Sequence, residues 1–198
     1  MPHTIVFATN NQHKLAEVQA LLPQGIALLG LAQMGIHDDI PETGSTLEAN
    51  ALQKARYVYA LTQRSCFADD TGLEVEALGN APGVLSARYA GPQKSSEDNM
   101  RKLLHELRGA QSRRARFRTV MALIDDGGRE FLFEGEVQGR ILEHRHGDGG
   151  FGYDPIFQPD GHTATFAQMP LELKNSISHR GRAVQRLVEF IAAHQSGL

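Results

Sequence analysis

Short apolar runs and amphipathic segments alternate over the first third of the chain. The β-branched run at residues 4–9 (TIVFAT) predicts a buried strand. Leucine and valine then recur at helical spacing over residues 15–22 and stop at Pro23, and a second apolar helical face covers residues 47–58. This part of the chain therefore predicts a strand followed by two helices.

The middle of the chain has more strand signals. Residues 66–68 and 73–78 predict two short strands. Residues 116–124 and 130–137 flank an Asp-Asp-Gly-Gly sequence, which is typical of the turn in a β-hairpin. Strands that alternate with helices early, followed by a hairpin, predict a mixed α/β sheet.

Two more helices complete the pattern. Ser95 or Ser96 can cap a helix that runs to Arg108, with Gly109 in the stop position, and residues 182–194 form a last amphipathic helix. No internal repeat, low-complexity tract or linker divides the sequence, and its length is sufficient for one substantial core. We therefore predict a single domain over residues 1–198.

Composition and charge narrow the class of protein. The chain has 20 Lys and Arg against 23 Asp and Glu, a net charge of −3, which disfavours nucleic-acid binding through bulk positive charge. Cys66 is the single cysteine and cannot form an internal disulfide. No apolar run is long enough to span a membrane, and the first residues lack a signal-peptide pattern. We expect a cytoplasmic protein without membrane or nucleic-acid partners.

A polar segment at residues 9–14 (TNNQHK) separates the first predicted strand from the first predicted helix. The free N–H groups and positive dipole end of a helix start suit phosphate, and Lys14 adds a full charge. An ordinary capped junction with a surface lysine is the alternative, and no glycine–lysine loop of the Walker type is present. The candidate phosphate ligands are Thr9, Asn10, Asn11, Gln12, His13 and Lys14.

Two adjacent carboxylates, Asp69 and Asp70, follow the apolar run at residues 66–68. Adjacent carboxylates that leave a buried strand repel each other and need a cation or hydrogen-bond donors nearby. Oxygen ligands of this kind suit Mg²⁺, which keeps several waters and bridges to substrate phosphates. An Asx turn that closes a hairpin is the alternative here. For Asp125 and Asp126, beside two glycines, the turn interpretation is favoured.

Two later segments carry further candidate ligand-binding side chains. Residues 149–155 (GGFGYDP) set aromatic rings between glycines, where they could stack on a flat base, and Asp154 could orient the loop or accept from a base or a ribose. Lys174, Ser178 and His179 are spaced so that a helical turn could bring them to one ligand. The alternatives are a core cluster beneath a long loop and a capped helix junction.

Two other clusters favour ordinary surface roles. The arginines of residues 113–118 form a basic run, but alternate positions of a strand face solvent there, which disfavours a nucleic-acid site. His144 and His146 lack a third metal ligand at recognisable spacing, so a surface loop is the favoured interpretation. We assign neither cluster to the predicted site.

Taken in order, these segments resemble the inosine/xanthosine triphosphate pyrophosphatase family, which acts on non-standard purine nucleoside triphosphates. The resemblance extends from Ile5 to His194, and the joint order and spacing of the motifs make it specific. The matching segments are TNNQHK (9–14), PETG (41–44), EANALQKA (48–55), ADDTGL (68–73), ALGNAPGVLSARY (77–89), GGFGYDPIF (149–157) and LELKNSISHRGRA (171–183).

The resemblance implies an elongated, two-lobed α/β fold around a long mixed sheet, with a nucleotide cleft between the lobes, and a homodimer. It further implies Mg²⁺-dependent hydrolysis of ITP, dITP and XTP to the monophosphate and pyrophosphate, which would cleanse the nucleotide pool. A related house-cleaning pyrophosphatase that acts on pyrimidine or modified nucleotides is the alternative.

The resemblance also assigns roles to residues. Glu42 and Asp70 would ligate Mg²⁺, and Asp70 would be the catalytic base. Because a metal-bound carboxylate is a poorer base, Asp69 could share the orientation of the attacking water. Lys54 would assist residues 9–14 in holding the triphosphate.

The nucleoside side of the predicted site comes from both halves of the chain. Asn10 stands where the family usually has glycine and Thr71 where it often has serine, and both departures could alter the fit of a loop. His179, Arg180 and backbone N–H groups are candidates for a donor to the 6-oxo group of the base. The resemblance surrounds the nucleoside with Thr71, Phe151, Gly152, Tyr153, Asp154, Lys174, His179 and Arg180.

Overall fold

The computed structural model describes residues 3–38 and 40–194. The chain divides into two compact units. Unit 1 comprises Met1–Asp70, Thr119–Gly135 and Arg180–Leu198, and unit 2 comprises Thr71–Arg118 and Glu136–His179. The predicted single domain and the predicted cleft between two lobes stay predictions.

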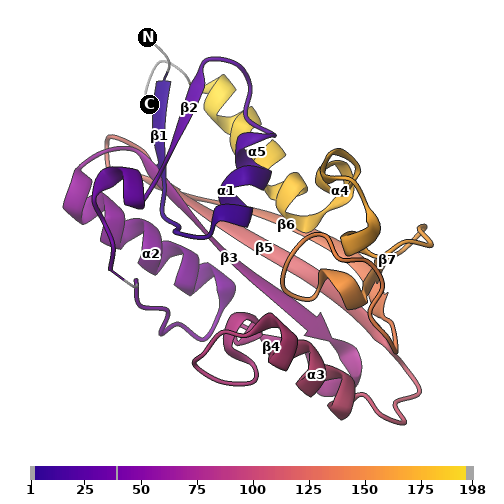
Figure 1. Ribbon diagram of the computed structural model, residues 1–198. Helices are drawn as coiled ribbons and strands as arrows, with labels where there is room; N and C mark the ends of the chain where they lie inside the picture. The colour runs from indigo at the N-terminus through magenta and orange to yellow at the C-terminus, as the bar shows by residue number, and fades with distance from the viewer. Residues whose placement is uncertain (1–2, 39, 195–198) are drawn as a thin grey trace. The chain divides into compact units, whose positions relative to one another are not determined.

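Seven strands and five α-helices occur in the described residues (Figure 1). The strands are β1 (His3–Phe7), β2 (Ile26–Gly30), β3 (Cys66–Val75), β4 (Ala81–Gly83), β5 (Arg114–Ile124), β6 (Glu130–Ile141) and β7 (Phe157–Pro159). The helices are α1 (Gln12–Gln19), α2 (Leu47–Thr62), α3 (Ser96–Glu106), α4 (Leu171–Ile177) and α5 (His179–Ala193).

The strands form one mixed sheet in the order β2-β1-β3-β5-β6-β7, with β4 paired to β3. Strand β1 is parallel to β2 and β3, whereas β4 and β7 are antiparallel to β3 and β6. The predicted mixed α/β fold is therefore confirmed. None of the helices in the described part of the chain is long and apolar enough to cross a membrane.

The helix starts follow from capping side chains. Asn11 Oδ1 accepts from the backbone N–H groups of His13 and Lys14 at the start of α1, and Thr46 accepts from Ala49 at the start of α2. Ser95 caps α3 by accepting from the N–H of Asp98, so the earlier of the two predicted caps is confirmed. Helix α5 begins at His179, three residues before the predicted Arg182, and its first two side chains, His179 and Arg180, are buried polar groups.

The core of unit 1 lies between helices α1 and α5 and strands β1, β3 and β5. The rings of Phe7 and Phe67 stack with centroids 4.5 Å apart, and Val184 and Leu187 of α5 are fully buried in the same cluster. Each such side chain contributes about 1.5–3 kcal/mol through burial. This packing fixes the carboxyl end of β1 and the middle of β3, which carry the predicted phosphate and carboxylate residues.

The core of unit 2 is one cluster that includes residues of helix α3 and several aromatic rings. Leu103 of α3 packs into the same cluster as Leu73 of β3. Phe117 lies edge-on to Phe157, with ring centroids 4.7 Å apart, and tilted beside Phe166. The segment at residues 149–157 is therefore anchored to a packed core and is not an isolated loop.

One difference from the sequence prediction matters for the site. Strand β3 is one continuous ten-residue strand, although two short strands were predicted within residues 66–78. The carboxylates of Asp69 and Asp70 interrupt the apolar pattern, yet both are buried inside the strand. The Asx-turn alternative for this pair is therefore wrong. For Asp125 the turn interpretation is confirmed, since its carboxylate accepts from the backbone N–H of Arg129 across the β5–β6 turn.

Candidate functional site

The predicted phosphate segment, residues 9–14, leaves β1 and forms the first turn of α1. Thr9 Oγ1 accepts from the N–H of Asn11, and Asn11 Oδ1 accepts from two further N–H groups at 3.0 and 3.2 Å. The side chains of Asn10, Gln12 and His13 are exposed. The capped-junction interpretation therefore describes the backbone correctly. The three exposed polar side chains are accessible to a ligand.

The departure at Asn10 does not require a glycine-like backbone. Positive φ values at described residues other than glycine occur at Gln63, Asn80 and Lys94, so Asn10 does not adopt the left-handed conformation. A hollow of about 480 Å³ lies beside it in unit 1. Its lining is Thr9, Asn10, Gln12, Leu15, Ala16, Gln19, Leu28, Gly30, Ala32 and Gln33.

Four charged side chains meet inside unit 1, and we call them the Lys14 cluster: Lys14, Glu17, Asp69 and Arg180. Lys14 Nζ lies 2.8 Å from Asp69 Oδ1, and Arg180 Nη2 lies 3.2 Å from Asp69 Oδ2. Arg180 Nη1 also lies 2.5 Å from Glu17 Oε2. The cluster contains two cations and two anions, so its formal charges cancel.

The cluster sets the protonation of its members. Burial alone would raise the pKa of Asp69, but the charges of Lys14 and Arg180 outweigh it and hold that pKa well below its usual range. Burial lowers the pKa of Lys14, and Asp69 opposes that shift. Asp69 is therefore ionised, with one cation at each carboxylate oxygen.

The sequence reasoning missed Glu17, which is buried on α1 one turn after Lys14. A charged residue among Leu15, Val18 and Leu21 would have been a usable signal, because a buried carboxylate needs a partner. The structure also places the guanidinium of Arg180, 1% exposed, on Glu17 and Asp69. Its predicted contact with the nucleoside stays a prediction.

A second group, which we call the Lys54 cluster, consists of Glu42, Asn50, Lys54 and Asp70, also within unit 1. Lys54 Nζ lies 2.5 Å from Glu42 Oε1 and 3.6 Å from Asp70 Oδ1. Asn50 Nδ2 donates to Asp70 Oδ2 at 2.9 Å. Helix α2 supplies Asn50 and Lys54 four residues apart, so both side chains leave the same face of the helix.

The pKa of Asp70 shifts in the opposite direction to that of Asp69. Burial raises the pKa of Asp70, and although Lys54 opposes the shift, Glu42 adds to it. Burial would lower the pKa of Lys54, but Asp70 and Glu42 outweigh burial and raise it. Lys54 is therefore protonated and lies between two carboxylates. One of them is Asp70, whose ionised form is disfavoured by burial.

The Lys54 cluster offers two carboxylates, Glu42 and Asp70, whose oxygens are the kind of ligand that Mg²⁺ takes. No group of three or more His, Cys, Asp or Glu side chains that could hold a metal occurs among residues 3–38 and 40–194. Glu42 and Asp70 nevertheless converge on one cation, the ammonium of Lys54. Two carboxylates that share a cation suit an ion that takes one or two protein oxygens and completes its shell with water and substrate phosphates.

Unit 2 holds the other predicted residues around Asp154. Lys174 Nζ lies 2.7 Å from Asp154 Oδ2, and both side chains are buried. The backbone N–H of Phe151 donates to the same carboxylate oxygen, and the ammonium lies 5.0 Å from the centroid of the Phe151 ring. An added Cβ at Gly150, where φ is +67°, would lie on that carboxylate. Asp154 thus anchors the glycine-rich loop, as predicted for one of its two roles.

The remaining predicted residues of unit 2 are placed as follows. His179 stacks on Phe117 with ring centroids 4.6 Å apart, and Tyr153 is a core residue whose hydroxyl donates to the carbonyl of Ser86. Thr71 and Gly152 are half-buried. Lys174 pairs with Asp154 and His179 stacks on Phe117, and both also lie near the ring of Phe166; their convergence on one ligand stays a prediction.

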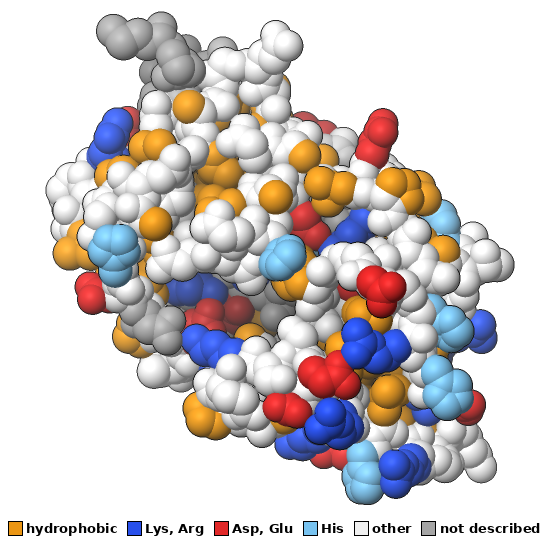
Figure 2. Space-filling view, viewed as in Figure 1, with side chains coloured by type: hydrophobic (Ala, Val, Ile, Leu, Met, Phe, Trp, Pro, Cys, Tyr) orange, Lys and Arg blue, Asp and Glu red, His pale blue; other side chains and the backbone are white. Residues whose placement is uncertain are grey.

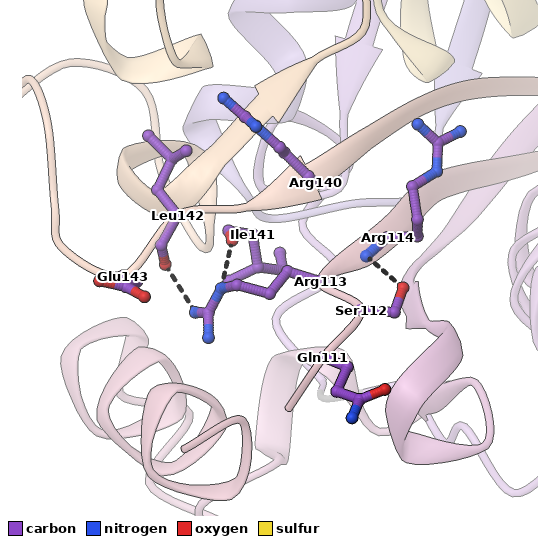
Figure 3. A pocket seen from close by; sticks show the side chains of 8 residues that line it. All are labelled: Gln111, Ser112, Arg113, Arg114, Arg140, Ile141, Leu142 and Glu143. Atoms are coloured by element: carbon purple, nitrogen blue, oxygen red, sulfur yellow. Dashed lines mark hydrogen bonds between the residues drawn. The ribbon is translucent and has the colours of Figure 1, made fainter. Parts of the chain in front are cut away.

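Unit 2 also contains a hollow of about 570 Å³ at the start of β5 (Figure 3). Three arginines line it, but they do not converge. The guanidinium of Arg113 donates to the carbonyls of Ile141 and Leu142, whereas the side chains of Arg114 and Arg140 extend away from it (Figure 3). The hollow is therefore not arranged to hold one anion.

The basic run at residues 113–118 is mostly neutralised within unit 2. The alternation predicted for it is confirmed, since Ala115 and Phe117 are buried between the arginines. Arg116 and Arg118 are half-buried, and both pair with Glu74, at 2.6 and 3.2 Å. On the face drawn in Figure 2, basic and acidic side chains likewise lie next to each other.

The fold and the two clusters of unit 1 define a class: a mixed α/β protein whose lysines and paired carboxylates gather at one internal strand. A model of the Ham1 family matches residues 5–190 of the sequence. The chain belongs to the Ham1 family. The resemblance inferred from the motifs is thereby confirmed.

Several relatives are similar over almost their full length. A dITP/XTP pyrophosphatase of Flavobacterium johnsoniae is 50% identical over 189 residues, which cover 96% of this chain and 98% of that protein. Another from Porphyromonas gingivalis is 53% identical over 188 residues and covers 94% and 96%. The solved structure of a HAM1 protein from Coxiella burnetii has a TM-score of 0.88 at 38% identity and covers 96% and 99%.

Proposed function

We propose that the chain is a nucleoside triphosphate pyrophosphatase that hydrolyses dITP, XTP and ITP to the monophosphate and pyrophosphate. The single observation that supports this most is the meeting of Asp69 and Asp70 with Lys14 and Lys54 around β3. Relatives at about half identity over nearly the whole chain carry the name dITP/XTP pyrophosphatase. The proposal includes Mg²⁺ dependence, a homodimer and a cytoplasmic location.

Charge neutralisation is the main requirement of this reaction, because a polyphosphate repels an anionic nucleophile. Lys14 at the start of α1 and Lys54 on α2 supply two ammonium groups, and the exposed side chains of residues 9–14 supply hydrogen bonds. Both lysines rest on carboxylates, so each can exchange that partner for a phosphate oxygen when a nucleotide binds.

The two aspartates then take different roles. Each oxygen of Asp69 carries a cation, which favours a role in holding Lys14 and Arg180. Asp70 is contacted by the amide of Asn50 and by a more distant ammonium, and its carboxylate would accept the proton of the attacking water. Because Mg²⁺ on Asp70 would make it a poorer base, Asp69 would share the orientation of that water. A water oxygen bonds to the α-phosphorus in line, the bond to the bridging oxygen breaks, and pyrophosphate leaves.

Glu42 and Asp70 would hold Mg²⁺ in this scheme, and Lys54 would move aside towards the phosphates. When bound, the ion supplies charge that stabilises the phosphate oxygens and the leaving pyrophosphate. Selectivity would come from a donor aimed at the 6-oxo group of hypoxanthine or xanthine, which ATP would leave unpaired; sites of this design discriminate by about 10⁴.

The decisive experiment measures pyrophosphate and orthophosphate released from dITP, XTP, ITP, ATP, GTP, dTTP and UTP, with Mg²⁺ and with EDTA. We expect pyrophosphate from the first three with Mg²⁺ and a loss of turnover in EDTA. Faster release from dTTP or UTP would instead support the alternative, a house-cleaning enzyme for pyrimidine nucleotides. Orthophosphate as the first product would contradict the proposal.

A further inference from the structure

A buried amide lies beside the carboxylate pair of the Lys54 cluster. Asn50 is 0% exposed on the N-terminal part of helix α2, a position where asparagine is a poorer helix former than alanine. Its side chain makes two hydrogen bonds: Oδ1 accepts from the backbone N–H of Gly44 at 2.8 Å, and Nδ2 donates to Asp70 Oδ2 at 2.9 Å. One short side chain thus joins the loop after Glu42 to the middle of β3.

Only one orientation of the amide satisfies both neighbours. Gly44 offers a donor and the Asp70 carboxylate offers an acceptor, so the carbonyl oxygen must face the loop and the amino group must face the strand. An aspartate at position 50 would place a second anion against Asp70, and an apolar side chain would leave both groups without this partner. Asparagine is therefore matched to the two neighbours chemically and not merely by size.

The loop is built to bring its backbone close to this amide. A Cβ added at Gly44 would lie 2.8 Å from Asn50 Oδ1 and 2.7 Å from the Cβ of Ala49. Any larger residue at position 44 would push the loop, and Glu42 with it, away from α2. The separation of Glu42 and Asp70 thus depends on the contact between Gly44 and Asn50.

We propose that Asn50 is the positioning residue that sets the geometry of the Glu42–Asp70 pair for its cation. It acts by orienting the Asp70 carboxylate from one side and holding the Glu42 loop from the other. This inference rests on the proposed function in that it takes the pair as the metal site. Partners that orient metal ligands in this way typically change metal affinity or activity by about 10–100-fold when removed.

Helix α2 offers a matched control at Gln53. Its amide also ties the same loop, since Oε1 accepts from the N–H of Thr43 at 3.0 Å and Nε2 donates to Thr43 Oγ1 at 3.1 Å. Both of these hydrogen bonds of Gln53 are with Thr43, and neither involves Asp70. Loss of loop tethering alone should therefore affect Gln53→Ala and Asn50→Ala alike, whereas loss of the Asp70 contact affects only Asn50.

The test compares wild type, Asn50→Ala, Asn50→Asp and Gln53→Ala. Pyrophosphate release from dITP gives kcat, KM and the Mg²⁺ concentration for half-maximal rate. Electron paramagnetic resonance gives Mn²⁺ affinity, for Mn²⁺ alone and with α,β-methylene ITP, without turnover. Thermal unfolding shows that each variant is folded.

For Asn50→Ala we expect kcat to fall, and the half-maximal Mg²⁺ concentration and Mn²⁺ Kd to rise, each about tenfold. KM for dITP at saturating Mg²⁺ should stay within about threefold, which a general loss of structure would not produce. Asn50→Asp keeps an acceptor for Gly44 but loses the donor to Asp70, so its kcat should fall similarly. Gln53→Ala should stay within about threefold of wild type throughout.

Equal effects of Asn50→Ala and Gln53→Ala would overturn the inference, as would a wild-type kcat in Asn50→Asp. Failure of the wild type to bind Mn²⁺ in both titrations would also overturn it. If the wild type bound Mn²⁺ but released no pyrophosphate from any nucleotide, the proposed function would fail. The ratio of Mn²⁺ affinities between wild type and Asn50→Ala would then still decide the role of Asn50.

Discussion

Asp70→Asn should lower kcat for pyrophosphate release by about 10²–10⁴ at saturating Mg²⁺, because it removes the proton acceptor and one carboxylate of the metal pair. The substitution is nearly isosteric. An amide oxygen at position 70 can still accept from Asn50 Nδ2, so the middle of β3 should remain folded. The measurement is steady-state turnover of dITP, with thermal unfolding as the check on structure.

Asp69→Asn is the matched control on the neighbouring residue. Asp69 faces Lys14 and Arg180, so its loss should reduce stability more, and turnover less, than the loss of Asp70. Near-normal turnover of Asp70→Asn would mean that the site is placed wrongly. A larger loss of turnover in Asp69→Asn than in Asp70→Asn would exchange the roles of the two aspartates.

The sequence predicted which charged residues of unit 1 belong to the candidate site, but not how they are arranged. The TNNQHK and ADDTGL motifs predicted that Lys14 and the aspartates act together, and Lys14 does contact Asp69. The motifs did not show that the aspartates lie inside a strand, because adjacent charges are typical of turns. Strand β3 lies between β1 and β5 in the sheet, and this arrangement joins residues far apart in the sequence.

The other contacts that the sequence did not predict join polar side chains far apart in the chain. Glu17 and Arg180 are 163 residues apart, and Asn50 and Asp70 belong to different elements. A single sequence shows no reason to connect them, although a charged residue on an apolar helical face, as at Glu17, indicates that a partner exists. Arg180 illustrates the converse: a motif indicated its importance, while its contacts depend on how α5 packs on β3.

The second large effect concerns stability. Arg180→Met should lower the free energy of unfolding by about 3–5 kcal/mol, because it leaves two buried carboxylates, Glu17 and Asp69, without the cation between them. Chemical denaturation measures this directly, and the melting temperature should fall by about 10 °C for a chain of this length. Methionine retains much of the volume, so the lost charge dominates over a cavity.

Arg56→Met is the control that separates burial from pairing. Arg56 also pairs with a carboxylate, Glu130 at 2.6 Å, but its side chain is 59% exposed. Solvent screens such a pair, so Arg56→Met should lower the free energy of unfolding by less than about 1 kcal/mol.

Adding Glu17→Gln to Arg180→Met removes one of the two buried carboxylates that lost this cation. The double variant should recover part of the lost free energy of unfolding, about 1 kcal/mol or more. Equal losses for Arg180→Met and Arg56→Met, or no recovery in the double variant, would show that the Lys14 cluster does not depend on charge balance.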